Sequence, residues 1–581
     1  MTAQFFTTWD GEQLFYRAWL PDQPAEKALV LFHRGHEHSG RFEDTVRRLQ
    51  LDDFAIFAWD ARGHGRSPGE RGWAESFACL VRDADCFVRH VSRRHAIPFE
   101  NVAVLAHSIG AVLAAAWVHD YGPPIRAMVL VSPAFRVKLY VPFALSFLRL
   151  QLRFRKKAFV TSYVRPGMLT HDPAEAESYA RDPLISRNVS VNLLVGMHDT
   201  ATRLIADAAA IRVPALMLSS GRDYVVALPA QREFFRRLGS PLKAAREYDG
   251  FYHSLLHERQ RAQPIAEARA FLLHAFQQPV LPDGAPRNQA EYERLSRPLP
   301  RFSPARLVWG AQRLFLRTVG KLSPGIRIGW QFGFDSGESL DYVYRNRADG
   351  LTPIGRLIDR IYLDSPGWRG IRQRRAHVEA VLRKAMDQLR SEGRPVHILD
   401  PAAGGGRYVL ETLSRVNGGQ ATANLRDLSQ SNVDAAARLA RELDLPGVTV
   451  SRGDAFDRRS LGAIAPRATI AIVSGLYELF PDNVRVRESL HGLADALEEG
   501  GYLIYTNQLW HPQLEMIARV LVNRDGRPWV MRCRGQAEID TIVRLAGFEK
   551  LETLLDDRGI FSVSLARRSP VKRPRAVRRY I

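Results

Sequence analysis

Two separate stretches of the chain each alternate short apolar runs with helical patterns. In the first stretch the apolar runs span residues 28–33, 54–60, 101–107, 126–132 and 214–221. In the second stretch they span residues 396–400, 421–427, 448–453, 469–474 and 502–507. Such an alternation predicts a mostly parallel sheet covered by helices on both faces. Because 581 residues are also too many for one hydrophobic core, the sequence predicts an α/β fold with two doubly wound domains.

Changes in composition suggest where these domains begin and end. We place the first domain at 1–277, with a cap inserted at about 134–211, where the strand pattern loosens. Residues 278–304 are rich in proline and polar side chains, which is typical of a linker. A basic helical segment at 305–389 then precedes the second domain at 390–568. The second domain closes with a predicted hairpin, formed by 550–556 and 559–565, and a basic tail follows at 569–581.

The net charge of +20 is the unusual feature of the composition. Basic residues are densest at 147–157, 306–317 and 567–581, and the first two segments interleave them with apolar side chains. Two interpretations remain open, which are contact with an anionic membrane surface and ordinary solvated faces in an arginine-rich chain. No nucleic-acid-binding motif is recognisable, so we expect no nucleic acid partner.

Neither a membrane span nor a disulfide framework is predicted. No apolar run reaches the length of a transmembrane helix, and the first residues lack the basic and apolar segments of a secretory signal. Three cysteines, Cys79, Cys86 and Cys533, without a C-x-x-C pair favour buried thiols in a reducing compartment. We therefore expect a cytoplasmic protein, which could also bind peripherally at the inner membrane face.

Residues 106–110 read AHSIG and follow the apolar run 102–105. A serine between small residues is typical of a strand-to-helix turn that exposes a nucleophile, here Ser108. Its hydroxyl needs an imidazole base and a carboxylate that orients the base, in the chain order Ser, acid, His. Asp223 follows a late strand and His253 lies in the loop after the next strand, so they are the candidate acid and base. The backbone N–H of Ile109 is a candidate oxyanion donor.

The loops after the first two apolar runs carry a further pattern. Residues 33–41 read HRGHEHSGR, and residues 60–67 read DARGHGRS. Together with the serine motif, they resemble the monoacylglycerol lipase and lysophospholipase family of α/β-hydrolases, also labelled serine-aminopeptidase-like, over about residues 10–275. The resemblance implies a lipid-like ester substrate, an acyl-serine intermediate, a triad of Ser108, Asp223 and His253, and oxyanion donors at Gly35 and Ile109.

The same loops also depart from that family. Arg34 and His36 stand where the family has glycines, so the mouth of the pocket should differ in shape and polarity. Four histidines, His33, His36, His38 and His64, could suggest a metal cluster. Histidines that brace the loops are the better interpretation in view of the resemblance, and we expect no metal.

A glycine-rich turn follows the first apolar run of the second stretch. Residues 398–406 read ILDPAAGGG, in which Asp400 ends the strand and Ala402, Gly404 and Gly406 follow at alternate positions. Such a turn lets the backbone approach a nucleotide where a helix begins. By itself this pattern also fits binding of NAD(H).

Acidic residues end the next two strands of the same stretch. Asp427 ends the second strand, where an acid can bind both ribose hydroxyls, and Asp454 and Phe456 follow the third, where they could meet the adenine amine and ring. A terminal hairpin is uncommon in dinucleotide-binding folds. These features resemble class I S-adenosylmethionine-dependent methyltransferases over about 390–568. The resemblance implies S-adenosylmethionine as the cofactor, with its methionine part near Asp400, Ala402, Gly404 and Gly406.

Tyr477 and Glu478 follow the fourth strand of this second stretch. We consider them candidate contacts for the methyl acceptor, although they could equally be structural. The sequence as a whole suggests a bifunctional enzyme, which joins a serine hydrolase for lipid-like esters to a methyltransferase. The alternative is a membrane-associated binding scaffold in which one or both sites are silent.

Overall fold

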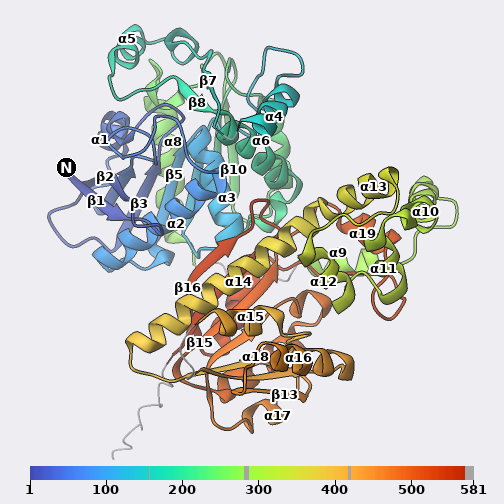
Figure 1. Cartoon of the computed structure of the whole chain (residues 1–581). Coiled ribbons are helices and arrows are strands. Elements are labelled where there is room, and N and C mark those ends of the chain that lie inside the picture. Colours follow the sequence, from blue (N-terminus) through green and yellow to red (C-terminus); the bar gives the residue numbers. More distant parts are fainter. Residues whose placement is uncertain (156, 280–286, 417–420, 570–581) are drawn as a thin grey trace, which may run out of the picture. The chain divides into compact units, whose positions relative to one another are not determined.

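The computed structural model describes residues 1–155, 157–279, 287–416 and 421–569. The chain divides into two compact units, Met1–Gly284 and Ala285–Ile581, and each contains its own large sheet (Figure 1). The predicted α/β fold with two doubly wound domains is therefore confirmed. Residues 280–286 of the predicted linker and 570–581 of the predicted basic tail lie outside the described residues. Within the described ranges, every helix is too short or too polar to cross a bilayer.

Eight strands form the sheet of the first unit in the order β1-β2-β4-β3-β5-β6-β9-β10. They are β1 (Thr2–Thr7), β2 (Gln13–Trp19), β3 (Lys27–Phe32), β4 (Phe54–Trp59), β5 (Val102–His107), β6 (Ala127–Val131), β9 (Ala215–Ser220) and β10 (Lys243–Tyr248). The pairs β1–β2 and β2–β4 are antiparallel and the others are parallel. Every residue of β4, β5, β6 and β9 is buried, as expected for strands covered on both faces.

Helices cover both faces of this sheet. The helices are α1 (Glu43–Leu49), α2 (Phe77–His95), α3 (Ile109–Tyr121), α7 (Leu228–Arg237) and α8 (Ala262–Gln277). One face packs with α1 and α8 in a core that includes Leu31, Leu105 and Leu272. On the opposite face α2 and α3 pack against each other, and α3 contacts β3 and β5. The active-site loops therefore leave a sheet that is held from two sides.

A long insertion lies between β6 and β9, and we keep the name cap for residues 134–211. It contains α4 (Ala144–Phe154), β7 (Phe159–Thr161), α5 (Pro173–Arg181), β8 (Asn188–Ser190) and α6 (Val191–Ala206). β7 and β8 pair antiparallel in a small sheet of their own. In Figure 1 α4, α5, β7 and β8 gather at the upper end of the first unit, whereas α6 returns to pack on α3.

Seven strands form the sheet of the second unit in the order β13-β12-β11-β14-β15-β17-β16. They are β11 (Val396–Asp400), β12 (Ala421–Asp427), β13 (Val448–Arg452), β14 (Ala468–Val473), β15 (Leu497–Gln508), β16 (Phe548–Leu555) and β17 (Phe561–Arg568). β17 runs antiparallel to both β15 and β16, and the remaining pairs are parallel. The terminal hairpin thus places β17 between β15 and β16.

Two cores lie on the two faces of this second sheet. The helices are α14 (Pro366–Ser391), α15 (Arg407–Arg415) and α16 (Gln430–Glu442) on one face, and α17 (Arg458–Gly462), α18 (Asn483–Ala496) and α20 (Gln536–Leu545) on the other. Ile472 belongs to the first core and Val473 to the second. Neighbouring strand residues divide in this way because their side chains point to opposite faces of a sheet.

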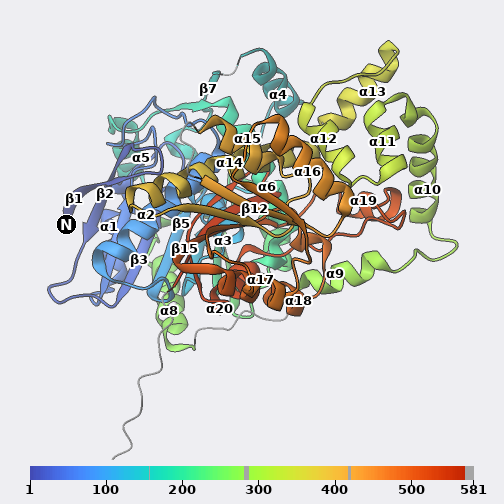
Figure 2. The same cartoon turned by 60° about the horizontal axis from the view of Figure 1, so that its bottom comes forward.

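A helical subdomain precedes the sheet of the second unit, visible at the right of Figure 2. Its helices are α9 (Arg287–Ser296), α10 (Pro304–Arg317), α11 (Pro324–Phe332), α12 (Gly337–Arg345) and α13 (Pro353–Leu363), joined by α19 (Leu514–Val520). The linker prediction is therefore wrong for residues 287–296, which form a helix. Leu295 of this helix is buried with Ile517 of α19. This tertiary contact orders a segment whose composition alone indicated a linker.

Candidate active sites

Ser108 sits on a sharp turn between β5 and α3. Its backbone adopts φ 57° and ψ −114°, which is strained for a residue with a side chain. Gly110 lies where a Cβ atom would come within 2.6 Å of the Phe32 and 2.5 Å of the His33 carbonyl oxygens. Only glycine permits α3 to begin this close to the end of β3. The small residue two positions after the serine therefore has a steric cause.

The structure brings the three predicted triad residues together. Ser108 Oγ lies 2.8 Å from His253 Nε2, and His253 Nδ1 lies 2.8 Å from Asp223 Oδ2. The side chains come from the loops after β5, β9 and β10, which end at the same edge of the sheet. All three residues are buried.

The environment of Asp223 determines which ring nitrogen of His253 carries a proton. Burial would raise the pKa of Asp223, but the facing His253 and the backbone N–H groups of Val225 and Val226 bring it below its usual value. An ionised carboxylate can only accept, so His253 Nδ1–H donates to Asp223. His253 Nε2 is then left to accept the proton of Ser108, which is the arrangement that a general base requires.

The two predicted oxyanion residues are neighbours. A Cβ atom on Gly35 would lie 2.7 Å from Cδ1 of Ile109. The loop that carries Gly35 is braced by His33, whose Nε2 accepts from the Ala61 N–H at 3.0 Å. Burial lowers the pKa of His36 to about 4. These histidines are neutral groups inside the loops.

Arg34, one of the two departures from the family pattern, connects this loop to the cap. Its guanidinium donates to Glu37 at 2.7 Å and lies 4.9 Å from the ring centroid of Tyr179 on α5. Arg34 and Glu37 are both buried. The side chain therefore fills the space beside the pocket mouth and fixes α5 above it.

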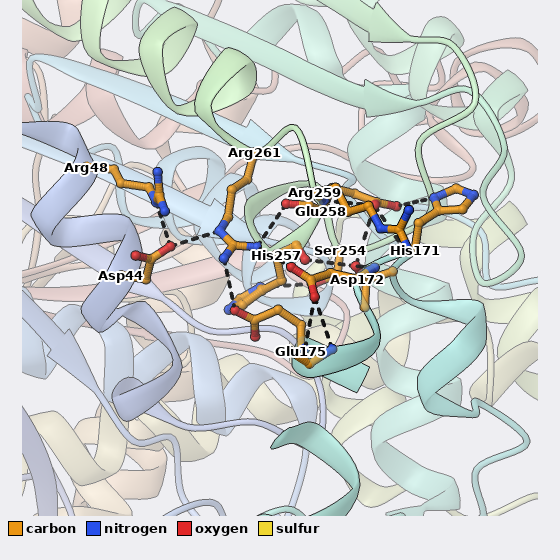
Figure 3. Close-up of polar contacts among 12 residues, drawn as sticks. Asp44, Arg48, His171, Asp172, Glu175, Ser254, His257, Glu258, Arg259 and Arg261 are labelled. Carbon is orange, nitrogen blue, oxygen red and sulfur yellow. Dashed lines mark hydrogen bonds and ion pairs between the residues drawn. The ribbon is translucent and has the colours of Figure 1, made fainter. Parts of the chain in front are cut away.

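A second set of charged groups holds the same end of the cap. Arg261 at the start of α8 bonds to Asp44 at 2.9 Å and to Asp172 at 3.0 Å, and it lies 3.5 Å from Glu175 (Figure 3). Asp44 belongs to α1, whereas Asp172 and Glu175 cap and begin α5. A single guanidinium therefore joins the cap to two helices of the first unit.

Glu258 ties the cap to the loop of the catalytic histidine. Its Oε1 accepts from the Tyr252 N–H at 2.9 Å. The same oxygen lies 2.9 Å from His171 Nδ1 (Figure 3). Its Oε2 accepts from the His171 N–H at 3.1 Å. Tyr252 directly precedes His253, so the position of this loop depends on contacts with the cap. Sequence reasoning missed Glu258 and His171, because no motif connects charges so far apart in the chain.

A large cavity of about 1190 Å³ opens at the carboxyl ends of the strands in the second unit. Six predicted cofactor residues line it, namely Ala402, Gly404, Gly406, Asp427, Asp454 and Phe456. Gly404 and Gly405 face open space, since a Cβ atom on either would meet no atom of the described residues within 4 Å. The turn after β11 therefore presents bare backbone to the cavity.

The acidic residues at the strand ends are held in place by hydrogen bonds. The Gly404 N–H donates to Asp427 Oδ2 at 2.9 Å, and Asn432 Nδ2 donates to Asp427 Oδ1 at 3.0 Å. Asp454 accepts from the Phe456 N–H at 2.9 Å. The Ser429 N–H also donates to Asp427 Oδ1 at 2.8 Å, so Asp427 can still accept at Oδ2, and Asp454 likewise keeps free lone pairs for a ligand.

Asp400 lies beneath the glycine-rich turn and is fully buried. It accepts from the Ala402 N–H at 3.1 Å and from the Tyr408 hydroxyl. Burial raises the pKa of Asp400 to about 7, against the effect of these two bonds. Asp400 therefore stabilises the conformation of the glycine-rich turn.

The two candidate acceptor residues differ in their surroundings. Glu478 is buried in the cavity wall, and its Oε1 accepts from Arg374 at 2.9 Å. Tyr477 instead packs in a core of the sheet, and its hydroxyl lies 3.1 Å from Ser489 Oγ. Of the two interpretations left open for Tyr477, its position therefore fits the structural one, because the turn after β14 points it inward. Arg374 of α14 was missed by sequence reasoning, as nothing in its segment distinguishes it from other basic residues.

Comparison with known proteins divides the chain in the same way. Residues 23–260 match the family model described as "Serine aminopeptidase, S33", and residues 268–568 match the one described as "Putative methyltransferase". Uncharacterized protein YnbC of Escherichia coli is 48% identical over 572 residues, which is 97% of each chain. Human monoglyceride lipase is 29% identical over 254 residues, covering 43% of this chain and 82% of that protein.

The crystal structure of Paleococcus ferrophilus monoacylglycerol lipase covers 45% of this chain and 99% of its own, with 23% identity and a TM-score of 0.42. The chain therefore belongs to the family of YnbC, and it joins a lipase- and esterase-like hydrolase domain to a domain of a methyltransferase family.

Proposed function

We propose that the first unit hydrolyses lipid-like carboxylic esters of the monoacylglycerol or lysophospholipid type. The observation that carries this proposal is the chain of 2.8 Å contacts from Ser108 through His253 to Asp223. Ser108 Oγ would attack the ester carbonyl while its proton passes to His253 Nε2, and Asp223 would stabilise the imidazolium. The N–H groups of Gly35 and Ile109 would bind the oxyanion. His253 would then protonate the leaving alcohol, and water would release the acid from Ser108.

We propose that substrate reaches this site only when the cap moves. The cavity between Gly35, Ile109 and the apolar side chains of Trp59 and Met197 measures about 50 Å³. Pockets for small-molecule ligands are usually about 300–1,000 Å³, so an acyl chain does not fit here. We therefore propose that the contacts of Arg34 and Arg261 with the cap break when substrate enters.

Turnover of a p-nitrophenyl acyl ester tests the hydrolase proposal. Ser108→Ala should lower the rate by at least ~10³-fold, because the nucleophile is removed. A fluorophosphonate probe should label the wild-type protein and fail to label Ser108→Ala. Binding of S-adenosylmethionine should stay unchanged in this variant, which serves as the control for folding of the second unit. A wild-type protein without a labelled serine would favour the silent scaffold instead.

We propose that the second unit transfers a methyl group from S-adenosylmethionine. The residues present fit this cofactor, because bare backbone at Gly404 and Gly405 faces the cavity and two carboxylates with free lone pairs stand beside it. Asp427 would hold the ribose hydroxyls and Asp454 the adenine amine, with Phe456 against the ring. When bound, the cofactor supplies an electrophilic methyl group, and the chain needs mainly to position the acceptor. The placement of β17 between β15 and β16 favours this cofactor over NAD(H).

Calorimetric titration with S-adenosylmethionine and with NADH separates the two cofactors. We expect binding of S-adenosylmethionine alone, and Asp427→Ala should weaken it at least ~10-fold, since hydrogen bonds to a charged group contribute about 1.5–3 kcal/mol. Asp434→Ala is the matched control, because Asp434 is an exposed residue of α16. Equal affinity for NADH, or an Asp427→Ala variant with wild-type affinity, would contradict the proposal.

We also propose that the protein works in the cytoplasm and binds an anionic membrane surface through the cap. Phe143, Phe147 and Phe154 around α4 are 86%, 66% and 79% exposed, and Arg149 and Arg153 lie on the same helix. Exposed aromatic and basic residues on one helix are typical of interfacial binding. Flotation with phosphatidylglycerol vesicles should weaken when Phe147 and Leu150 are replaced by Ser. Leu545→Ser, on α20 and 60% exposed, is the control.

A further inference from the structure

The cavity of the second unit is larger than a cofactor site needs to be. Its volume of about 1190 Å³ exceeds the roughly 300–1,000 Å³ that is usual for one small ligand. The strand-end residues described above form only one part of its wall. The remainder is formed by helices of the helical subdomain and by α14, and we call this part of the cavity the chamber.

The chamber has a large apolar wall beside a few polar residues, such as Gln312 of α10 and Asp341 of α12. Six different helices, α10, α11, α12, α13, α14 and α19, each contribute an aliphatic or thioether side chain to its wall: Leu316, Ile326, Leu340, Ile358, Ile371 and Met516. Side chains of this kind stabilise a bound hydrocarbon chain, because each buried methylene contributes about 0.8 kcal/mol. They offer little to a sugar, a nucleotide or a peptide backbone.

Two polar atoms at the chamber wall have no hydrogen-bond partner among the described residues. They are Oε2 of Glu478 and Nε1 of Trp529, on side chains that line the cavity and are only 6% and 8% exposed as residues. Leaving such atoms buried without partners is unfavourable by about 1–3 kcal/mol each. After a small rotation of either side chain a ligand with a polar end could satisfy them, since one atom accepts a hydrogen bond and the other donates one.

The entrance of the chamber is apolar as well. Phe315 of α10 and Ile361 of α13 line the cavity and remain 49% and 64% exposed. Leu314 and Leu357 on the same two helices are 64% and 61% exposed. α10 and α13 both contact the short helix η6 (Val319–Leu322). Apolar side chains thus continue from the surface into the chamber.

We propose that the methyl acceptor of the second unit is an amphiphile with a long alkyl or acyl chain. The chain lies in the chamber of the helical subdomain, and a hydroxyl or amine at its polar end donates to Glu478 Oε2. The role of this ligand as methyl acceptor rests on the proposed methyltransferase function, whereas its chemical class follows from the chamber itself.

Binding of 11-(dansylamino)undecanoic acid to the full chain tests the proposal by fluorescence. Ile358→Trp should fill the chamber and weaken binding at least ~10-fold, which corresponds to about 1.4 kcal/mol. Ile354→Trp is the matched control, because Ile354 lies one turn earlier on α13, is 63% exposed and does not line the cavity. This control should bind within about twofold of wild type, a difference below 1.4 kcal/mol. Any binding of the probe to the first unit is the same in both variants. The difference in probe affinity between the two variants therefore measures binding in the chamber.

A displacement series on the wild-type protein gives a second measurement that needs no variant. Hexadecanol should displace the probe in the chamber, and butanol at the same concentration should not. The inference would be overturned by equal probe affinity in Ile358→Trp and Ile354→Trp. It would also be overturned if hexadecanol and butanol displaced the probe equally well. Calorimetry with S-adenosylmethionine, run beside these titrations, separates the two proposals. Cofactor binding without amphiphile binding refutes only the acceptor class, and amphiphile binding without cofactor binding supports the ligand class but refutes methyl transfer.

Discussion

Arg374 on α14 and Glu478 after β14 form a buried ion pair across the wall of the large cavity, with 2.9 Å between Nη1 and Oε1. The two side chains are each 6% exposed, so neither charge is solvated by water. The pair joins α14 to the turn that follows β14. Its geometry fixes the unpartnered Oε2 of Glu478 at the chamber.

Removing one partner of this pair should destabilise the second unit more than removing both. Arg374→Met would leave Glu478 as an unpaired buried charge, which costs about 3–5 kcal/mol in comparable cases. Adding Glu478→Gln should recover most of that loss. Hydrogen exchange of peptides from β14 measures the stability of this unit separately from the first. A double variant as unstable as Arg374→Met alone would show that the charge of Glu478 is not the cause.

Asp400 should make the stability of the second unit depend on pH. Its pKa is about 7 in the folded protein, above the value of about 3.9 in an unfolded chain. The folded state therefore binds the extra proton, and stability falls as the pH rises from about 4 to about 7. Asp400→Asn cannot ionise, so its advantage over wild type should grow across this window, to on the order of 4 kcal/mol at pH 8. Thermal unfolding at pH 5 and pH 8 measures the difference, and an advantage independent of pH would contradict the assignment.

Gly110→Ala should inactivate the hydrolase without touching any substrate. The added Cβ would lie 2.5 Å from the His33 carbonyl oxygen, so β3, the loop with Gly35 and the turn at Ser108 must shift apart. Displacements of about 1 Å can cost ~10²-fold in rate, and we expect at least that loss in kcat/KM for a p-nitrophenyl ester. Gly167→Ala is the control, since its Cβ would meet nothing within 4 Å among the described residues. Wild-type turnover by Gly110→Ala would refute the steric explanation.

The sequence sufficed for the triad because each member follows a strand that can be recognised by its apolar residues. Ser108, Asp223 and His253 follow β5, β9 and β10, and parallel strands bring such positions to one edge. The glycine-rich turn at Gly404 and the acid at Asp427 could be found by the same reasoning. In each case a local pattern and the sheet topology were enough.

Contacts that depend on side chains distant in sequence could not be found in this way. Nothing near Glu258 indicates His171, and nothing near Arg374 indicates Glu478, because a single charge is compatible with many partners. The helix at residues 287–296 was not predicted for the same reason, since the burial of Leu295 depends on α19. The role of Tyr477 stayed open because an aromatic residue after a strand fits a pocket mouth and a core equally well. The chamber itself is assembled from six helices that share no motif.

Glu258 should stabilise the positions of both the cap and the loop that carries His253. Both carboxylate oxygens accept hydrogen bonds from N–H groups of Tyr252 and His171, so the amide of Glu258→Gln must direct an NH₂ group at one of these donors. We expect a loss of about 1.5–3 kcal/mol at this junction, because the bonds involve a charged group. Hydrogen exchange should rise in α5 and in residues 252–258, and kcat should fall more than KM changes. Glu177→Gln on the outer face of α5 is the matched control, being 58% exposed. If Glu258→Gln loosened α5 but left kcat at the wild-type value, the cap and the catalytic loop would be independent, and the cap could open without displacing His253.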